Sequence, residues 1–271
     1  MNHLAFHIQV SRSELREILL GLLPEVGVEG IEELDDQLIA YANSNGIDEE
    51  QIKELLERLG CAYTIEVVNE TNWNQNWESN FEPVVIAGAV QIRASFHKKD
   101  EGVPYSMLIT PKMSFGTGHH ATTRMMIKLL LNHFIKGASV MDFGTGTGVL
   151  AILSEMMGAN HVVAIDVDDW SIANAAENFA LNGCSYISII KDDSVQKTGN
   201  FDILLANINK NVLLDQASEL HDHINKNGLL FISGLLSTDY QDICKAYSPI
   251  FGPPFVQLEE NGWIALGMRK S

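Results

Sequence analysis

The fold is decided by one stretch of the chain, Ser139-Val140-Met141-Asp142-Phe143-Gly144-Thr145-Gly146-Thr147-Gly148. Its first residues predict a strand, and apolar residues at helical spacing after Gly148 predict a helix. Glycine permits a sharp turn between the two and lets a ligand lie against bare backbone at the helix N-terminus. An ordinary strand-to-helix turn would use the same glycines, so this stretch alone does not identify a ligand.

The next predicted strand, residues 162–166, ends in an acid 22 positions beyond Gly144. A carboxylate at that place can accept hydrogen bonds from both ribose hydroxyls of an adenosine cofactor. The turn and Asp166 together predict an adenosine site on a Rossmann-like α/β domain.

Two kinds of adenosine cofactor use this architecture. Nicotinamide dinucleotides need the spacing GxGxxG, because the helix N-terminus then binds a pyrophosphate. Here the spacing is GxGxG, with Gly146 in the middle, and Asp142 precedes it. A carboxylate repels pyrophosphate but suits a positive methionine ammonium, directly or through water. S-adenosylmethionine therefore fits better, with Asp142, Gly144, Gly146 and Asp166 as predicted cofactor contacts.

A later predicted strand, residues 201–206, ends at Asn207. Ligands of open α/β sheets bind at the carboxyl ends of the strands, so the Asn207 amide is expected to face the transferring methyl group. A turn-forming asparagine is the alternative interpretation. Asp192 and Asp193 follow another predicted strand, residues 187–190, where a side chain would reach the adenine edge; adjacent acids in a loop are more often only solvated.

A second motif, Ser114-Phe115-Gly116-Thr117-Gly118-His119-His120-Ala121-Thr122-Thr123, opens a predicted helix before the core sheet. Small, hydroxyl and imidazole groups over a helix N-terminus can close the methionine end of the cofactor. Adjacent histidines also suggest a metal, but no acid or cysteine at ligand spacing supports one, and we expect no metal. Three widely spaced cysteines likewise indicate neither disulfides nor zinc.

The first 70 residues predict a smaller, separate domain. Strands at 4–10, 28–33, 37–42 and 61–68 and helices at 11–23 and 48–59 follow the order βαββαβ, the ferredoxin-like α+β pattern. Residues 71–82, which include Trp73 and Trp77, are interpreted as a linker. From residue 83 to 271 the chain has a β-rich entry at 84–96 and 107–109. Strands and helices then alternate, which predicts a mostly parallel sheet covered by helices.

Charge divides the chain unevenly. The net charge of −17 argues against nucleic acid as a direct partner, because phosphate binding normally needs a basic face. Residues 1–70 hold 15 acidic and 4 basic side chains, a net of −11. A solubilising surface and a docking surface for a cationic partner explain this equally well. No apolar stretch approaches the roughly 20 residues of a membrane span, and no secretory signal opens the sequence, so we expect a cytoplasmic protein.

The chain resembles a bacterial methyltransferase family that acts on protein eleven of the large ribosomal subunit. The resemblance covers nearly the whole length and is most specific at residues 73–83, 115–123, 142–148 and 206–208. It implies a class I S-adenosylmethionine-dependent methyltransferase domain, with cofactor contacts at Thr123, Gly144, Asp166 and Asn207. Ala121 stands where the family pattern commonly has proline, which leaves the helix start less fixed.

The resemblance also implies the reaction, which is methyl transfer to lysine ε-amines of that basic ribosomal protein; it leaves the N-terminal α-amine open as a further acceptor. Asn207 is then the predicted catalytic residue, which orients the amine through its carbonyl. A small-molecule or nucleobase N-methyltransferase would share the core, although a nucleobase enzyme usually has aromatic and proline residues where this chain has Ile208-Asn209-Lys210. A nucleotide-binding protein without catalysis is the third alternative.

Overall fold

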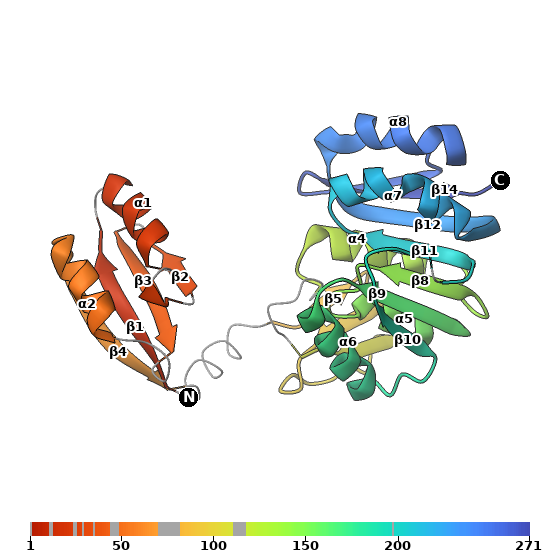
Figure 1. Cartoon of the computed structure of the whole chain (residues 1–271). Helices are drawn as coiled ribbons and strands as arrows, with labels where there is room; N and C mark the ends of the chain where they lie inside the picture. The colour runs from red at the N-terminus through yellow and green to blue at the C-terminus, as the bar shows by residue number, and fades with distance from the viewer. Residues whose placement is uncertain are drawn as a thin grey trace. The chain divides into compact units, whose positions relative to one another are not determined.

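A computed structural model describes residues 2–10, 13–23, 26–28, 30–34, 36–43, 49–69, 82–110, 118–196 and 198–271. The chain divides into two compact units, Met1–Glu82 and Pro83–Ser271 (Figure 1). The linker predicted at 71–82 lies outside the described residues except for Glu82.

The N-terminal unit has the predicted order of elements. They are β1 (Asn2–Gln9), α1 (Ser13–Leu22), β2 (Gly30–Glu33), β3 (Gln37–Asn43), α2 (Glu49–Arg58) and β4 (Tyr63–Asn69). The sheet order is β2-β3-β1-β4, and all neighbouring strands are antiparallel. This is the ferredoxin-like arrangement, in which each helix connects two strands that are not neighbours.

Strand alternation gives this small sheet one apolar face. Phe6, Ile8 and Leu38 are buried against Leu19 of α1 and Ile52 of α2 in one hydrophobic core. Each such side chain contributes about 1.5–3 kcal/mol when it is fully buried. A slip of one residue in register would turn the apolar set outward, so this core also fixes the pairing of the strands.

The C-terminal unit contains a seven-stranded sheet of order β10-β9-β8-β11-β12-β14-β13. The first five strands in this order are parallel to one another, whereas β14 is antiparallel to both β12 and β13. The strands are β8 (Ser139–Phe143), β9 (His161–Asp166), β10 (Ile187–Lys191), β11 (Phe201–Asn207), β12 (Ile224–Leu236), β13 (Val256–Glu260) and β14 (Trp263–Arg269). The strand order reverses between β8 and β11, and a crevice for ligands is expected outside their carboxyl ends.

Helices cover both faces of this sheet (Figure 1). Helices α4 (Ala121–Leu131), α5 (Val149–Met156) and α6 (Asp169–Leu181) share one hydrophobic cluster with Val140 of β8. Helices α7 (Lys210–Asp222) and α8 (Tyr240–Phe251) share the opposite cluster with Met141. Adjacent strand residues are therefore buried on opposite faces, as expected for a parallel sheet between helical layers.

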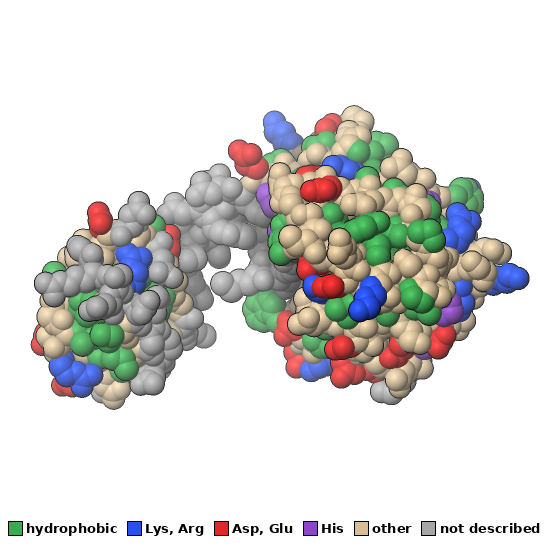
Figure 2. Space-filling model, turned by 90° about the horizontal axis from the view of Figure 1, so that it is seen from above, with side chains coloured by type: hydrophobic (Ala, Val, Ile, Leu, Met, Phe, Trp, Pro, Cys, Tyr) green, Lys and Arg blue, Asp and Glu red, His purple; other side chains and the backbone are tan. Residues whose placement is uncertain are grey.

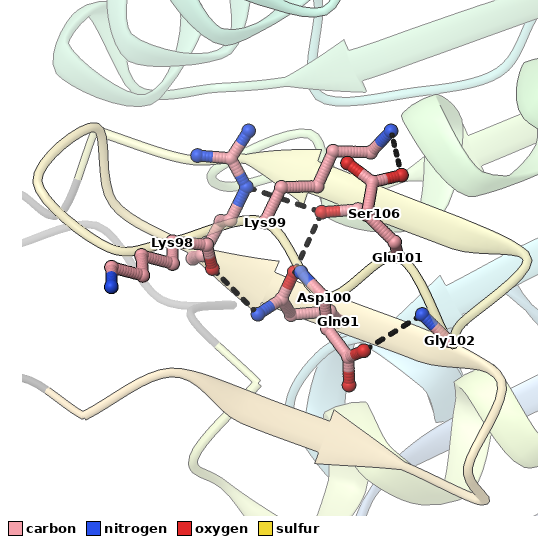
Figure 3. A network of polar contacts seen from close by, with 8 residues as sticks. Gln91, Lys98, Lys99, Asp100, Glu101, Gly102 and Ser106 are labelled. Carbon is pink, nitrogen blue, oxygen red and sulfur yellow. Dashed lines mark hydrogen bonds and ion pairs between the residues drawn. The ribbon is translucent and has the colours of Figure 1, made fainter.

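A small sheet of β5 (Val84–Ile86), β6 (Val90–Arg93) and β7 (Tyr105–Leu108) precedes the large one. The loop between β6 and β7 is held by the buried amide of Gln91 (Figure 3). Gln91 Nε2 donates to Lys98 O at 3.1 Å, and Oε1 accepts from Asp100 N at 2.9 Å and Ser106 Oγ at 2.7 Å. Because both ends of the amide are bonded, β7 is fixed to β6 by a side chain as well as by the strand ladder.

Charged side chains of both signs lie scattered over the face seen from above in Figure 2, and acids gather along the lower edge of the larger unit. Among the described residues visible there, lysine and arginine side chains are separated by other side chains and form no continuous surface. No helix in the described ranges is both long and apolar enough to cross a membrane.

Candidate active site

A cavity of about 520 Å³ opens at the carboxyl ends of the parallel strands. Its volume falls within the roughly 300–1,000 Å³ of small-molecule sites. It is lined by His120, Thr122, Thr123, Phe143, Gly144, Thr145, Gly146, Val149, Leu150, Asp166, Val167, Ser171, Asp192, Asp193, Asn207, Ile208, Asn209, Val212, Gly234 and Trp263. The cavity therefore lies where the reversal of strand order predicts a crevice.

The glycine-rich turn between β8 and α5 is held by β9. Gly144 N and Thr145 N both donate to Ile165 O, at 2.8 and 2.9 Å. Gly144 has a φ of +78°, and a Cβ there would lie 2.2 Å from Ile208 Cγ2. Position 144 needs glycine both for its backbone angle and for the close approach of the loop after β11.

Asp166 lines the cavity at the end of β9 with its carboxylate fixed by the backbone. Oδ2 accepts from Gly146 N at 2.9 Å, and Oδ1 accepts from Asp168 N at 3.1 Å. A carboxylate has about four acceptor positions, so each oxygen keeps one for a ligand hydroxyl. Asp192 also lines the cavity, but its Oδ1 accepts from Asp193 N and Ser194 N of its own loop.

Asp142 is placed differently from the other predicted contacts. Its side chain is 1% exposed, and it is not among the residues that line the cavity. Oδ2 accepts from Thr145 Oγ1 at 2.7 Å, and the backbone N–H of Ala151 also interacts with this carboxylate. Burial raises the pKa of Asp142 to about 7, against the opposing effects of the Thr145 hydroxyl and the Ala151 backbone N–H. Its contact with the cavity runs through Thr145.

Asn207 and Thr123, 84 residues apart in the sequence, meet at the wall of the cavity. Asn207 Nδ2 lies 3.5 Å from Thr123 Oγ1, a long hydrogen bond. Asn207 Oδ1 is buried and accepts no hydrogen bond from the residues that the structure describes. An unpaired buried acceptor costs about 1–3 kcal/mol, so a ligand that donates a hydrogen bond here would recover that cost.

The second sequence motif is described from Gly118 onward; residues 114–117 lie outside the described ranges. His120 caps α4, since its Nδ1 lies 2.8 Å from Thr122 Oγ1 and accepts from Thr122 N at 3.4 Å. Ala121 is the first helical residue, the position that favours proline. Without the proline, the His120 side chain fixes the helix start. His119 exposes its ring and accepts a hydrogen bond from Arg124 at its carbonyl oxygen.

His120 also forms part of the cavity wall together with Trp263. The two rings meet edge to face, with centroids 4.7 Å apart. Burial, and then the Arg124 guanidinium, lower the pKa of His120 below its ordinary value. The imidazole is therefore neutral at pH 7, and this wall is aromatic and uncharged.

Sequence reasoning missed seven lining residues, Val149, Leu150, Val167, Ser171, Val212, Gly234 and Trp263. Gly234 has a φ of +86°, and a Cβ there would lie 2.1 Å from Ile208 O, at a register shift of β12 between Ile232 and Leu235. A single glycine inside a strand pattern signals such a close approach and could have identified it. No local signal singles out Trp263. Within the described ranges, no group of three or more His, Cys, Asp or Glu side chains could hold a metal ion.

Known proteins resemble this chain over almost its full length. The family model described as ribosomal protein L11 methyltransferase (PrmA) matches residues 10–271. The chain belongs to the ribosomal protein L11 methyltransferase family. A relative of that name from Phocaeicola vulgatus is 37% identical over 261 residues, which cover 93% of this chain and 92% of the relative. Another from Porphyromonas gingivalis is 37% identical over 259 residues, or 92% and 89% of the two chains.

Solved structures agree with this assignment. The crystal structure of a ribosomal protein L11 methylase from Lactobacillus delbrueckii subsp. bulgaricus matches with a TM-score of 0.66 and 28% identity, over 70% of this chain and all of that one. A 16S rRNA N2 G1207 methyltransferase from T. Thermophilus, in complex with AdoMet and guanosine, matches with a TM-score of 0.51 and 19% identity over 58% and 45%. The second likeness concerns the fold alone. The predicted class I methyltransferase fold is confirmed, and the family is one of S-adenosylmethionine-dependent protein methyltransferases.

Proposed function

We propose that this protein transfers methyl groups from S-adenosylmethionine to lysine ε-amines of ribosomal protein L11. The observation that carries the proposal is the buried Oδ1 of Asn207 at the end of β11, which accepts no hydrogen bond from the described residues. A hydrogen-bond acceptor in that place suits an incoming amine, which brings N–H donors. Such a substrate favours a cytoplasmic protein.

The charge of the cavity wall supports a positively charged cofactor. Among the described residues that line it, three are aspartates, Asp166, Asp192 and Asp193, and none is lysine or arginine. A pyrophosphate would find no cationic partner there, which disfavours a nicotinamide dinucleotide. S-adenosylmethionine carries a sulfonium and an ammonium, and both suit acidic surroundings.

Three groups of residues would hold this cofactor. The Asp166 carboxylate, fixed by two backbone N–H groups, would accept from the ribose hydroxyls. The backbone of Gly144 and Gly146 would give the close approach that no side chain obstructs. Asp142, through Thr145, would provide negative charge for the ammonium, and Thr123 would contact the cofactor from the start of α4.

When bound, the cofactor supplies an electrophilic methyl group on a sulfonium. Only a neutral amine attacks it, and deprotonating a lysine of pKa about 10.4 at pH 7 costs roughly 4.6 kcal/mol. Desolvation in the cavity and the neutral wall of His120 and Trp263 favour the neutral amine. Asn207 Oδ1 accepts one amine N–H and turns the lone pair toward the methyl carbon. The amine would take up the methyl group of the bound cofactor as the C–S bond breaks and the N–C bond forms, and the surplus amine proton would pass to solvent.

The N-terminal unit is the proposed reader of the protein substrate. Strands β1 to β4 contain no lysine or arginine, whereas Arg16, Lys53 and Arg58 lie on the helices. Since both helices pack on one face of the sheet, the other face carries Glu32 and Glu66 and no lysine or arginine.

Two contacts organise this sheet face, which is defined here by His7, Glu32, Tyr41 and Glu66. Tyr41 Oη donates to Glu32 Oε2 at 2.9 Å, and His7 Nε2 lies 3.2 Å from Glu66 Oε2. Partial burial, followed by Glu32 and Glu66, raises the pKa of Tyr41 to about 12, so the phenol stays neutral. An aromatic ring between carboxylates suits a surface that contributes lysine and arginine side chains.

The deciding experiment offers all candidate acceptors at once. The protein is incubated with methyl-labelled S-adenosylmethionine and with ribosomal proteins and ribosomal RNA from cells that lack this methylation. We expect label on lysines of L11 and none on RNA. Label on RNA, or on small molecules only, would favour the nucleobase or small-molecule alternative, and binding without any transfer would favour a non-enzyme.

A further inference from the structure

Helix α6 and its C-cap carry three asparagines, Asn174, Asn178 and Asn182, at a spacing of four residues. Asn174 is 1% exposed and Asn178 is fully buried. Buried asparagine inside a helix is unfavourable unless its amide finds partners outside the helix. The contacts of these amides therefore indicate what the residues are for.

The amides of Asn178 and Asn182 form hydrogen bonds with the backbone at the end of β7, in the way that a neighbouring strand would. Asn182 Oδ1 accepts from Leu108 N at 2.8 Å, and its Nδ2 donates to Leu108 O at 2.6 Å. Asn178 Oδ1 accepts from Thr110 N at 2.8 Å. Four residues rise about 6 Å along a helix and two residues about 6.6 Å along a strand, so the two spacings match.

Asn178 differs from Asn182 in its second contact. Its Nδ2 donates to Thr147 O, at 2.8 Å, inside the glycine-rich turn. The neighbouring Phe179 packs beneath the same turn, because a Cβ at Gly148 would lie 2.4 Å from Phe179 Cε1. The first half of the turn is bonded to Ile165 O and Asp166 of β9, so Asn178 holds the second half.

We propose that Asn178 is a positioning residue for the cofactor. Its side chain does not line the cavity but fixes the backbone of the glycine-rich turn through Thr147 O. Its other end is tied to a firmly held segment, since β7 is fixed to β6 through Gln91 and Ser106 (Figure 3). The turn is thus clamped between β9 and the end of β7, and the cavity wall at Gly144 and Gly146 is preformed. The inference rests on S-adenosylmethionine being the ligand of this turn.

The test compares the same substitution at Asn178 and at Asn182. Asn178→Asp keeps an acceptor for Thr110 N and removes the donor to Thr147 O. Asn182→Asp, the matched control, keeps an acceptor for Leu108 N and has no contact with the turn. Calorimetry should show S-adenosylmethionine affinity at least about tenfold weaker in Asn178→Asp and within about twofold of the unaltered protein in Asn182→Asp, since preorganisation is lost only in the first.

Hydrogen exchange of the ligand-free protein gives a second readout. Amide exchange at residues 144–148 should accelerate in Asn178→Asp and stay unchanged in Asn182→Asp. Asn178→Ala, which buries no charge, is measured in both ways. Affinity within twofold in both Asn178 variants, or equal weakening in Asn182→Asp, would overturn the proposal. Loss of folding in both Asn178 variants while Asn182→Asp folds would assign a structural role and overturn it too. If the unaltered protein failed to bind S-adenosylmethionine, the proposed function would fall, while the exchange rates would still report on Asn178.

Discussion

The N-terminal and C-terminal units place their polar side chains differently. In the described part of the N-terminal unit, the buried residues are apolar, and Tyr41, Glu32 and Glu66 make their polar contacts near the surface. Every polar or charged residue that is buried within the described ranges belongs to the C-terminal unit. One acceptor that lines its cavity, Asn207 Oδ1, is buried and accepts no hydrogen bond from the residues that the structure describes.

This difference separates two kinds of recognition. Buried polar groups cost free energy unless they are paired, so a fold keeps them where a small ligand completes the pairing. Surface charges contribute little locally but act over about 10 Å at 0.1 M salt, which suits a large charged partner. The C-terminal unit should therefore govern cofactor affinity and turnover with little salt dependence, and the N-terminal unit should govern a salt-sensitive capture of protein substrate.

The largest effect is expected from Asp166→Ala. Two hydrogen bonds from ribose hydroxyls to a charged carboxylate are lost, at about 1.5–3 kcal/mol each, and Gly146 N loses its partner. The dissociation constant of S-adenosylmethionine should rise by at least about 100-fold, as measured by calorimetry, at low and high salt alike. The matched control is Asp169→Ala, because Asp169 is an exposed neighbour whose carboxylate lies 2.6 Å from Lys191 Nζ. Unchanged affinity in Asp166→Ala, or tight binding of NADH by the unaltered protein, would remove the cofactor assignment.

Asn207→Ala should come next in size. Turnover is expected to fall by roughly 10- to 100-fold while cofactor affinity changes by less than about threefold, because the amide aligns the amine instead of anchoring the cofactor. Separate measurement of kcat and of the dissociation constant of S-adenosylmethionine distinguishes alignment of the amine from anchoring of the cofactor. Asn211→Ala, an exposed position on α7, serves as the control and should leave both unchanged. Turnover within threefold of the unaltered protein would mean that Asn207 is a turn residue.

Local patterns were enough to predict the parts of the site that lie at the ends of single strands. Gly144, Gly146, Asp166 and Asn207 all line the cavity, since each follows a strand whose place the sequence indicates. The order of elements in the N-terminal unit was also predictable, because alternation and helical spacing are local signals.

Other features depended on long-range packing. Trp263 reaches the cavity only because β14 lies antiparallel between β12 and β13, an order that no local pattern encodes. Asp142 lies two residues after Val140 in β8, so its side chain points to the same face, toward α5. The sequence showed a carboxylate before the turn but not that strand alternation buries it behind Thr145.

A fragment of residues 82–271 tests whether cofactor binding and substrate capture belong to different units. It should keep S-adenosylmethionine affinity within about threefold but lose more than about tenfold in kcat/KM for L11. In the full chain, the KM for L11 should rise as salt is added from 0.05 to 0.3 M, because exposed charges are screened. A fragment that methylates L11 normally would place recognition in the C-terminal unit and leave the N-terminal charge as a solvated surface.

Charge reversal tests whether the sheet face with Glu32 and Glu66 is the docking surface for L11. Glu32→Lys with Glu66→Lys changes this sheet face, and the KM for L11 should rise by about fivefold. Glu54→Lys with Glu57→Lys makes the same change of net charge at exposed positions of α2 and should alter KM by less than about twofold. Equal effects of the two pairs would mean that only net charge matters and that the sheet face is not the docking surface.

The effect expected from Asp142 is a pH dependence of stability and not a change in substrate recognition. Burial raises the folded-state pKa to about 7, above an unfolded value near 3.9. The folded protein thus binds this proton more tightly, so the contribution to stability is complete below about pH 4 and is lost as pH rises through 7. Asp142→Asn mimics the protonated form and should lack this dependence. Relative to the variant, the unaltered protein should lose stability by roughly 1.4 kcal/mol per pH unit at most between pH 4 and 7. Calorimetric melting of both proteins from pH 5 to 8 measures the difference, and saturating S-adenosylmethionine should reduce it, because a nearby ammonium favours the carboxylate. Parallel melting curves would show that Asp142 stays ionised behind Thr145, and a difference that the cofactor leaves unchanged would separate Asp142 from the cofactor ammonium.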